Sequence, residues 1–279
     1  MARAVWSGSI SFGLVNVPVK LYPAVRKKDV HFHQLDEKSG ARIRNRRVSA
    51  SSGREVPNER IVKGYELDKG TYVPVTDDEL DAVEPERTHT IDVEDFVALD
   101  EVDPLQYVNT YWIAPEGDKG ASKAYALLRD AMDRTGRVAI ARFVMRTKEH
   151  LVMLRPVDKA LALHTMLYPD EVVPASDVDG LPVRAKADDR ELKMATQLVE
   201  SLTVAWDPKR YKDSYREKLL DVIKRKAEGE DIVTEPGEKK PAEVVDLMAA
   251  LEASIEASKQ RGGKSRARSR PRSRSRKSA

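Results

Sequence analysis

Apolar and polar residues alternate along much of the chain, which is the spacing of β-strands. Between residues 10 and 21 an apolar side chain recurs at every second position, at Ile10, Phe12 and Leu14 and, after an interruption at Asn16, at Val17, Val19 and Leu21. Seven later segments are rich in β-branched or alternating residues and are expected to be extended: 30–35, 42–48, 90–99, 108–113, 138–146, 150–154 and 161–167. We therefore predict many short strands in the first two thirds of the chain.

The helical period appears in four other places. Residues 119–135 place Ala124, Leu127, Leu128, Ala131 and Met132 on one face, and Gly136 stands where a helix commonly ends. A capping-box pattern at 76–79 predicts a short helix that stops before Pro85. Beyond Pro169 three apolar stripes, over 192–202, 211–223 and 244–255, indicate helices. The pattern favours a mainly β fold, a barrel or sandwich, with helical extensions.

Charge is distributed unevenly along the 279 residues, although the net charge is only +3. The last 21 positions, 259–279, hold ten basic residues and no acid, which leaves 39 basic against 46 acidic residues before them. Their Ser/Arg composition cannot form a core, so we expect a disordered tail that binds phosphates non-specifically. An acidic body with a basic tail is common among nucleic-acid binders.

The composition also limits the compartment and the chemistry. The chain has no cysteine, which excludes disulfides and thiolate metal sites. No run approaches the roughly 20 apolar residues of a membrane helix, and the first residues lack the apolar core of a secretory signal. We expect a soluble protein of the cytoplasm.

No motif with a catalytic mechanism stands out. Residues 262–265 read GGKS, the end of a phosphate-binding loop, but Ser258 occupies the position of its first glycine and no strand precedes it. His31 and His33 share a face if their segment is a strand, yet no third ligand has a suitable spacing. A metal-dependent nuclease built on these histidines stays an alternative, and ordinary strand histidines are the simpler interpretation.

A basic stretch is the more informative feature. In a strand, Arg42, Arg44 and Arg46 point to one side at intervals of roughly 6.7 Å, so they could meet successive phosphates without reading bases. Arg54, Arg60 and Lys63 follow, and Arg142 and Arg146 would share a face on a later strand. Solvated charges that protect edge strands from aggregation are the competing interpretation.

Seven blocks of sequence follow one another along the chain: WSGSISFGLVNVPV at 6–19, HFHQ at 31–34, IVKGYE at 61–66, VEDF at 93–96, KAYALLR at 123–129, GRVAIARF at 136–143 and LHTML at 163–167. In this order they resemble the bacterial Ku proteins, which bind broken DNA ends. The resemblance implies a Ku-type β-barrel core, a homodimeric ring around duplex DNA, no catalytic residue and no cofactor. It also implies a partner, the multi-domain ATP-dependent DNA ligase of bacterial end joining.

One departure from the family concerns a metal. Many relatives carry a CxxC pair where this chain reads SASSG at 49–53. Serine is a poor zinc ligand, so we expect the turn at this position without a metal.

These observations give a provisional organisation. We expect a Ku β-barrel core over 1–205, a helical extension for ligase recruitment over 206–233, a further helix or linker over 234–258 and the tail over 259–279. The DNA contacts are assigned to Arg42, Arg44, Arg46, Arg54, Lys63, Arg142, Arg146, Arg266, Arg268 and Arg270. The ligase contacts are assigned to Trp206, Tyr211, Tyr215 and Arg216. An architectural protein that coats DNA through the tail is the alternative function.

Overall fold

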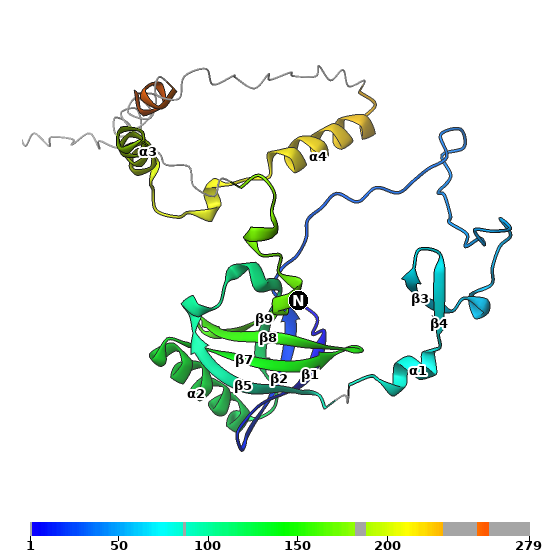
Figure 1. The fold of residues 1–279 in the computed structure, drawn as a ribbon, viewed down its shortest axis with the longest axis horizontal. Helices are drawn as coiled ribbons and strands as arrows, with labels where there is room; N and C mark the ends of the chain where they lie inside the picture. Colours follow the sequence, from blue (N-terminus) through cyan, green and yellow to red (C-terminus); the bar gives the residue numbers. More distant parts are fainter. Residues whose placement is uncertain (1, 86–87, 182–187, 231–249, 257–279) are drawn as a thin grey trace, which may run out of the picture. The chain divides into compact units, whose positions relative to one another are not determined.

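The computed structural model describes residues 2–85, 88–181, 188–230 and 250–256. Two compact units divide the chain, residues 1–177 and 178–279 (Figure 1). The first unit holds every strand that the structure describes, and the second is helical.

A closed barrel forms the centre of the first unit. Its strands are β1 (Trp6–Phe12), β2 (Val15–Pro23), β5 (Thr90–Ala98), β6 (Tyr107–Pro115), β7 (Arg137–Met145), β8 (Lys148–Val157) and β9 (Ala160–Met166). They follow the order β1-β2-β6-β9-β8-β7-β5. All neighbours are antiparallel except β1 and β5, whose parallel pairing of Ser9 with Thr90 and Ile10 with Ile91 closes the barrel. The expected β-barrel core is therefore present.

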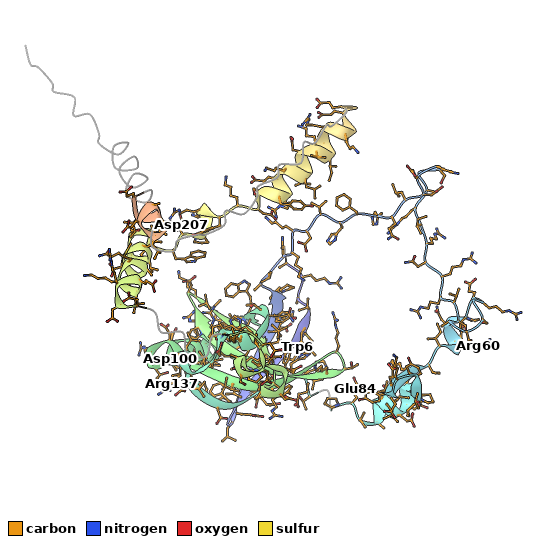
Figure 2. The ribbon with its side chains drawn as sticks, turned by 45° about the horizontal axis from the view of Figure 1, so that its top comes forward. Trp6, Arg60, Glu84, Asp100, Arg137 and Asp207 are labelled. Atoms are coloured by element: carbon orange, nitrogen blue, oxygen red, sulfur yellow. The ribbon has the colours of Figure 1, made fainter. Side chains whose placement is uncertain are left out.

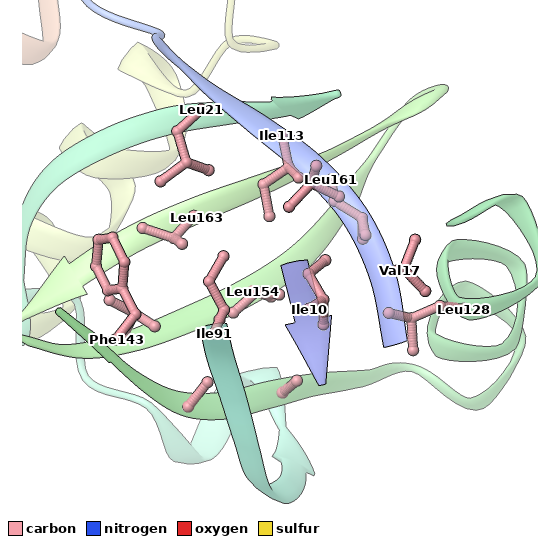
Figure 3. Packing of buried hydrophobic residues seen from close by; sticks show 14 of the residues in the cluster. Ile10, Val17, Leu21, Ile91, Ile113, Leu128, Phe143, Leu154, Leu161 and Leu163 are labelled. Carbon is pink, nitrogen blue, oxygen red and sulfur yellow. The ribbon is translucent and has the colours of Figure 1, made fainter. Parts of the chain in front are cut away.

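Alternation along the strands fills the barrel interior. Ile10, Ile91 and Leu163 are fully buried there and meet Phe143 and Leu154 from neighbouring strands (Figure 3). A second apolar cluster joins Val102, Val138, Met153 and Met166. Strand β9 contributes to both clusters, because all six of its residues from Leu161 to Met166 are buried. A strand buried on both faces explains why its sequence is a continuous apolar run.

Helix α2 (Lys119–Thr135) packs against β2, β6, β7 and β8. Asp118 caps its first turn, and Gly136 ends it in the left-handed conformation, with φ of 62°. Tyr125 anchors it to the barrel: its hydroxyl donates to the Ile113 carbonyl at 2.7 Å and accepts from the Leu161 amide at 2.7 Å. Burial raises the pKa of Tyr125. The predicted helix is confirmed, although Leu127 lies off the buried face and is 70% exposed.

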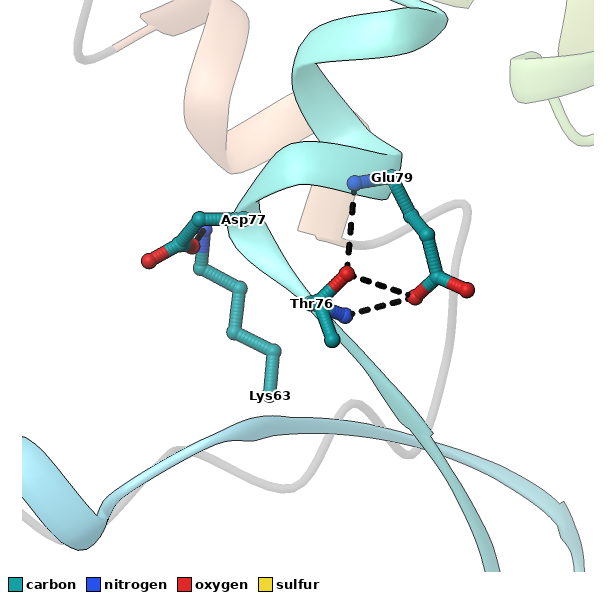
Figure 4. A network of polar contacts seen from close by, with 4 residues as sticks. All are labelled: Lys63, Thr76, Asp77 and Glu79. Atoms are coloured by element: carbon teal, nitrogen blue, oxygen red, sulfur yellow. Dashed lines mark hydrogen bonds and ion pairs between the residues drawn. The ribbon is translucent and has the colours of Figure 1, made fainter.

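Residues 24–85 form an excursion between β2 and β5, which we call the arm. It contains β3 (Lys63–Asp68), β4 (Thr71–Val75) and helix α1 (Asp77–Ala82), and no described residue in it is buried. The predicted capping box opens α1: the Thr76 amide donates to the Glu79 carboxylate at 2.8 Å, and the Glu79 amide donates to the Thr76 hydroxyl at 3.3 Å (Figure 4).

The strands expected at 30–35 and 42–48 are absent from the arm, where that prediction was wrong. Only two isolated bridges form there, Leu35 with Arg42 and Val48 with Glu55. Both flank tight turns, and neither pair gains a further neighbouring strand or an apolar face to bury. Alternation of residue types is therefore not sufficient for a strand here.

The remaining elements are helical. Short 3-10 turns cover Asn58–Arg60, Leu99–Glu101, Pro104–Gln106, Pro169–Glu171 and Ala175–Asp177. The second unit holds α3 (Asp189–Leu202), a 3-10 turn at Pro208–Arg210, α4 (Ser214–Ala227) and helical residues at 250–256. Tyr211 lies before α4, and the predicted stripe over 244–255 falls partly outside the described residues. Within the described ranges, no helix has the length and hydropathy of a membrane span.

Candidate nucleic-acid interface

Residues 42–54 of the arm carry a cluster of exposed positive charge. Residues 42–54 hold five arginines and no acid. Arg42, Arg44, Arg46 and Arg54 are all exposed, and Figure 2 shows the side chains of the arm standing out from an extended backbone. Such a surface offers guanidinium groups to phosphates without a base-reading element.

Two similar turns set the path of this segment. The Gly40 amide donates to the Asp36 carbonyl, and the Gly53 amide donates to the Ser49 carbonyl, each at 2.8 Å. Both glycines have positive φ, 68° and 66°. The Ser49 amide also donates to the Arg54 carbonyl at 2.9 Å. The turn predicted at 49–53 is confirmed, and its own backbone hydrogen bonds hold it.

The prediction that Arg42, Arg44 and Arg46 point to one side of a strand is wrong. Residues 42–48 do not form a strand, so Arg42, Arg44 and Arg46 do not line one face of a sheet. Arg46 forms an ion pair with Glu55 at 2.9 Å, because the bridge beside the Ser49–Gly53 turn brings the two segments together. In contrast, Arg42, Arg44 and Arg54 have no ion-pair partner in the part of the chain that the structure describes. Their charges are available to a polyanion.

Lys63 is partly neutralised. Its ammonium group lies 3.0 Å from the Asp77 carboxylate at the start of α1 (Figure 4). Both side chains are exposed, so the pair is weak and a phosphate could compete with the carboxylate.

Arg142 and Arg146 do not share a strand face, so that prediction was also wrong. Arg142 lies on β7 between acids of the neighbouring strands, 3.0 Å from Glu94 and 3.3 Å from Glu149. Glu94, then Glu149, raise the pKa of Arg142. Arg146 lies after the end of β7, in the turn to β8, with φ of 65°. Glu94 is distant in the sequence and Glu149 lies on the next strand, so their approach to Arg142 depends on strand register and gave no signal before the fold was known.

An aromatic cluster marks the second unit. The rings of Trp206 and Tyr211 stack with centroids 5.2 Å apart and an interplanar angle of 27°. Asp207, labelled in Figure 2, opens the 3-10 turn that brings them together and accepts a hydrogen bond from the Lys209 amide at 3.0 Å. Trp206, Tyr211 and Tyr215 are 76%, 67% and 74% exposed. Three of the four predicted ligase contacts therefore present exposed aromatic surface, and Arg216 follows in the first turn of α4.

The structure says less about the remaining predicted site residues. His31 and His33 lie in an extended segment that is not a strand, and no three metal-ligating side chains gather among the residues that the structure covers. Arg266, Arg268 and Arg270, the GGKS sequence at 262–265 and the tail all lie outside the described residues.

A closed β-barrel with an exposed, arginine-rich arm defines a protein whose surface suits a polyanionic partner. Comparison with known proteins agrees with this class. A family described as "Ku70/Ku80 beta-barrel domain" matches residues 11–194. The chain belongs to the Ku family.

Its relatives match along most of their length. A protein of Anaeromyxobacter sp. is 49% identical over 254 residues, which are 91% of this chain and 85% of that protein. A protein of Heliobacterium modesticaldum is 44% identical, covering 91% of each chain. A protein of Bacillus subtilis is 38% identical, covering 90% of this chain and 81% of the relative. All three carry the name "Non-homologous end joining protein Ku".

Proposed function

We propose that this protein binds the ends of double-stranded DNA as a homodimeric ring and recruits the multi-domain ATP-dependent DNA ligase of bacterial end joining. It acts without catalysis of its own, where bacterial DNA lies in the cytoplasm. The observation that carries the proposal is the combination of a Ku barrel with an arm on which Arg42, Arg44 and Arg54 are exposed and have no ion-pair partner among the described residues. The names of the relatives support the same process.

The arm also supports the homodimer. Its hairpin β3–β4 has only two strands and no core, and such hairpins are marginally stable alone. Apolar side chains stand exposed on it, with Tyr65 at 67%, Leu67 at 62% and Tyr72 at 61%. Burying these residues against a second copy would stabilise the hairpin by removing apolar area from water. Two arms and two barrels together would provide the closed path around a duplex that one barrel cannot provide.

End specificity follows from such a ring. A closed ring cannot load onto uninterrupted DNA, so it enters only at an end, whatever the sequence. Contacts to the phosphates are then sufficient, and arginine suits them because its planar group pairs with phosphate oxygens and keeps its charge. Binding of this kind needs no helix that reads bases in a groove of the DNA.

Ligase recruitment is assigned to the extension 206–233. Aromatic residues are enriched at interface hot spots, and Trp206, Tyr211 and Tyr215 are exposed. The competing interpretation is that Tyr211 and Tyr215 pack this helix on the core.

A pair of substitutions tests this surface. Trp206→Ala with Tyr211→Ala should leave DNA binding within about twofold and reduce stimulation of the ligase at least tenfold, because a hot-spot pair contributes about 2 kcal/mol or more. Lys224→Ala, at an exposed position of α4, is the control. Loss of both DNA binding and ligase stimulation would instead support the interpretation that Trp206 and Tyr211 have a packing role.

The tail supports a second candidate, an architectural protein that coats DNA. Ten positive charges at 259–279 bind phosphates wherever they lie. On a threaded ring the same charges would instead add affinity through effective concentration, through Arg266, Arg268 and Arg270 among others.

Competition between DNA forms separates the two candidates. Linear duplex should displace a labelled duplex from the full-length protein well, and covalently closed circular duplex of the same sequence poorly. Equal competition by the two forms would favour the coating protein.

A further inference from the structure

A hollow of about 350 Å³ lies at the base of the arm, between the first arm residues, β6 and the turn from β7 to β8. We call it the arm-base pocket. Two cations, Lys27 and Arg146, and the Asn109 amide line it beside an apolar wall that includes Val25 and Val108. None of its lining residues is acidic.

The two cations have no other use that the described residues reveal. Neither Lys27 nor Arg146 has an ion-pair partner among them. Arg142, four residues earlier on the same hairpin, is held by two carboxylates. Acids therefore neutralise Arg142, whereas no acid lines the pocket beside Lys27 and Arg146.

Arg146 occupies a backbone conformation that suits glycine. It is the first of two residues that join β7 to β8, after the pair Met145–Lys148, and its φ is 65°. Two-residue hairpin turns with positive φ at this position favour glycine there. The other non-glycine residues with positive φ in the described chain are His89 and Asp158, which are of the types enriched in that region. Arginine is not, so a strained residue places its charge at the pocket, and such strain is concentrated at functional sites.

The opposite side of the pocket also departs from regular structure. The register of β6 against β9 shifts between Tyr107 and Asn109, which marks a β-bulge. The Asn109 backbone is fixed there by a hydrogen bond from its amide to the Thr165 hydroxyl, at 3.0 Å. Bulges redirect side chains and are over-represented next to functional sites. The bulge thus fixes the strand that brings Asn109 to the pocket.

We propose that the arm-base pocket binds one phosphate group of DNA. Lys27 and Arg146 bind its oxygens, Asn109 donates a hydrogen bond, and the apolar wall accommodates the adjoining deoxyribose. The volume is at the lower end of ligand pockets, which range over roughly 300 to 1,000 Å³, so it fits one nucleotide-sized group. The proposal rests on the DNA-binding function above and adds a defined phosphate site to it. The phosphate belongs either to the backbone or to a 5′ end.

Two turn substitutions in the full-length protein test the pocket. Arg146→Gly removes both the strain and the cation, whereas Asp158→Gly relieves a positive φ of 50° in the turn between β8 and β9, away from the pocket. Arg146→Gly should have a raised Tm, whereas Asp158→Gly should change the Tm little, because aspartate already tolerates this conformation. Only Arg146→Gly should bind linear duplex several-fold more weakly, with a salt slope lower by about 0.9, the value for one lost phosphate contact.

A second variant tests whether the weaker DNA binding of Arg146→Gly is an indirect effect of the changed turn. Lys27→Ala should weaken binding in the same direction, and the double variant with Arg146→Gly should lose less than the sum, because the two cations share one phosphate. Each protein is measured on duplexes with 5′-phosphate and with 5′-hydroxyl ends. A loss confined to 5′-phosphate ends assigns the pocket to the terminal group, and an equal loss assigns it to the backbone.

An unchanged salt slope for Arg146→Gly would contradict the proposed phosphate site. An equal loss of DNA affinity for Asp158→Gly would contradict it as well. If the wild-type protein fails to prefer linear over closed duplex, the proposed end binding fails instead, while the slope of Arg146→Gly still reports on the phosphate site.

Discussion

Gly8 lies where β1 meets the chain entering β5, at the closure of the barrel. A Cβ atom at this position would lie 2.1 Å from the His89 carbonyl oxygen and 2.3 Å from the Trp6 ring. The same His89 carbonyl accepts a hydrogen bond from the Ser9 amide at 2.9 Å, beside the parallel pairing of β1 with β5. Any side chain would push these two strands apart.

We therefore expect Gly8→Ala to lower the free energy of unfolding by about 3 kcal/mol, the upper part of the range for overpacked sites. Gly64→Ala is the control, because its Cβ would meet the nearest atom, on Tyr72, at an ordinary 3.5 Å. Urea denaturation followed by circular dichroism measures both. An equal loss in the two variants would show that close packing at Gly8 is not the cause.

His164 gives the barrel a pH dependence. It is 5% exposed, and Arg155 donates a hydrogen bond to its Nε2 at 2.9 Å. Its Nδ1 therefore carries the proton and donates to the Thr110 hydroxyl at 3.0 Å. Burial, and then the charge of Arg155, lower the pKa of His164 from 6.5.

The sign of the effect follows from linkage. As the pH falls, His164 takes up a proton in the unfolded chain before it does so in the folded protein. The contribution of His164 to the free energy of unfolding is therefore at its maximum above about pH 6.5, and it decreases as the pH falls toward the lower pKa of the folded state. His164→Gln should reduce this decrease between pH 7 and pH 5. Burial also lowers the pKa of His150, so part of the slope should remain. Denaturant titrations at several pH values measure it, and an unaltered slope would contradict the role of His164.

At the scale of elements, the arm is the segment whose charge should control DNA affinity. Arg42→Ala with Arg44→Ala should weaken binding about equally for unrelated sequences and lower the salt slope by about 0.9 per lost contact. Folding should be unaffected, because both side chains are exposed and unpaired among the described residues. Fluorescence anisotropy at several salt concentrations measures the slope.

Arg142→Ala is the matched control for the arm. It removes the same charge from the barrel, where Glu94 and Glu149 already neutralise it. We expect its salt slope to match the wild type. A larger change in the salt slope for Arg142→Ala than for the arm variant would assign the phosphate contacts to Arg142 and not to the arm.

The barrel strands could be predicted from the sequence, whereas the strands expected in the arm at 30–35 and 42–48 did not form, for one physical reason. Strands β1, β7 and β9 bury alternate or continuous apolar residues, so their pattern records the core. Residues 30–48 carry a similar pattern without a core to face, and only bridges form there.

The candidate site was partly predictable for the same reason. The exposed aromatic residues and the basic stretch are visible as residue types. The pairing of Arg142 with Glu94 and Glu149, the pairing of Arg46 with Glu55, and the approach of Lys27, Asn109 and Arg146 depend on strand register and turn conformation. Local sequence does not encode these arrangements.

At the scale of the whole molecule, the central proposal is that the protein encloses DNA rather than only adhering to it. Arginines on the arm and ten charges in the tail would bind phosphates in either case. Affinity alone therefore does not distinguish a ring from a coating protein, whereas escape from the DNA does.

The most direct test is to measure dissociation from linear duplex after bulky protein caps have been placed on its ends. The protein is loaded first, one or both ends are capped, and the salt concentration is raised to remove electrostatic binding. We predict that complexes persist on duplex capped at both ends and are lost from duplex with one free end. Equal rates of loss from the two substrates would contradict the ring.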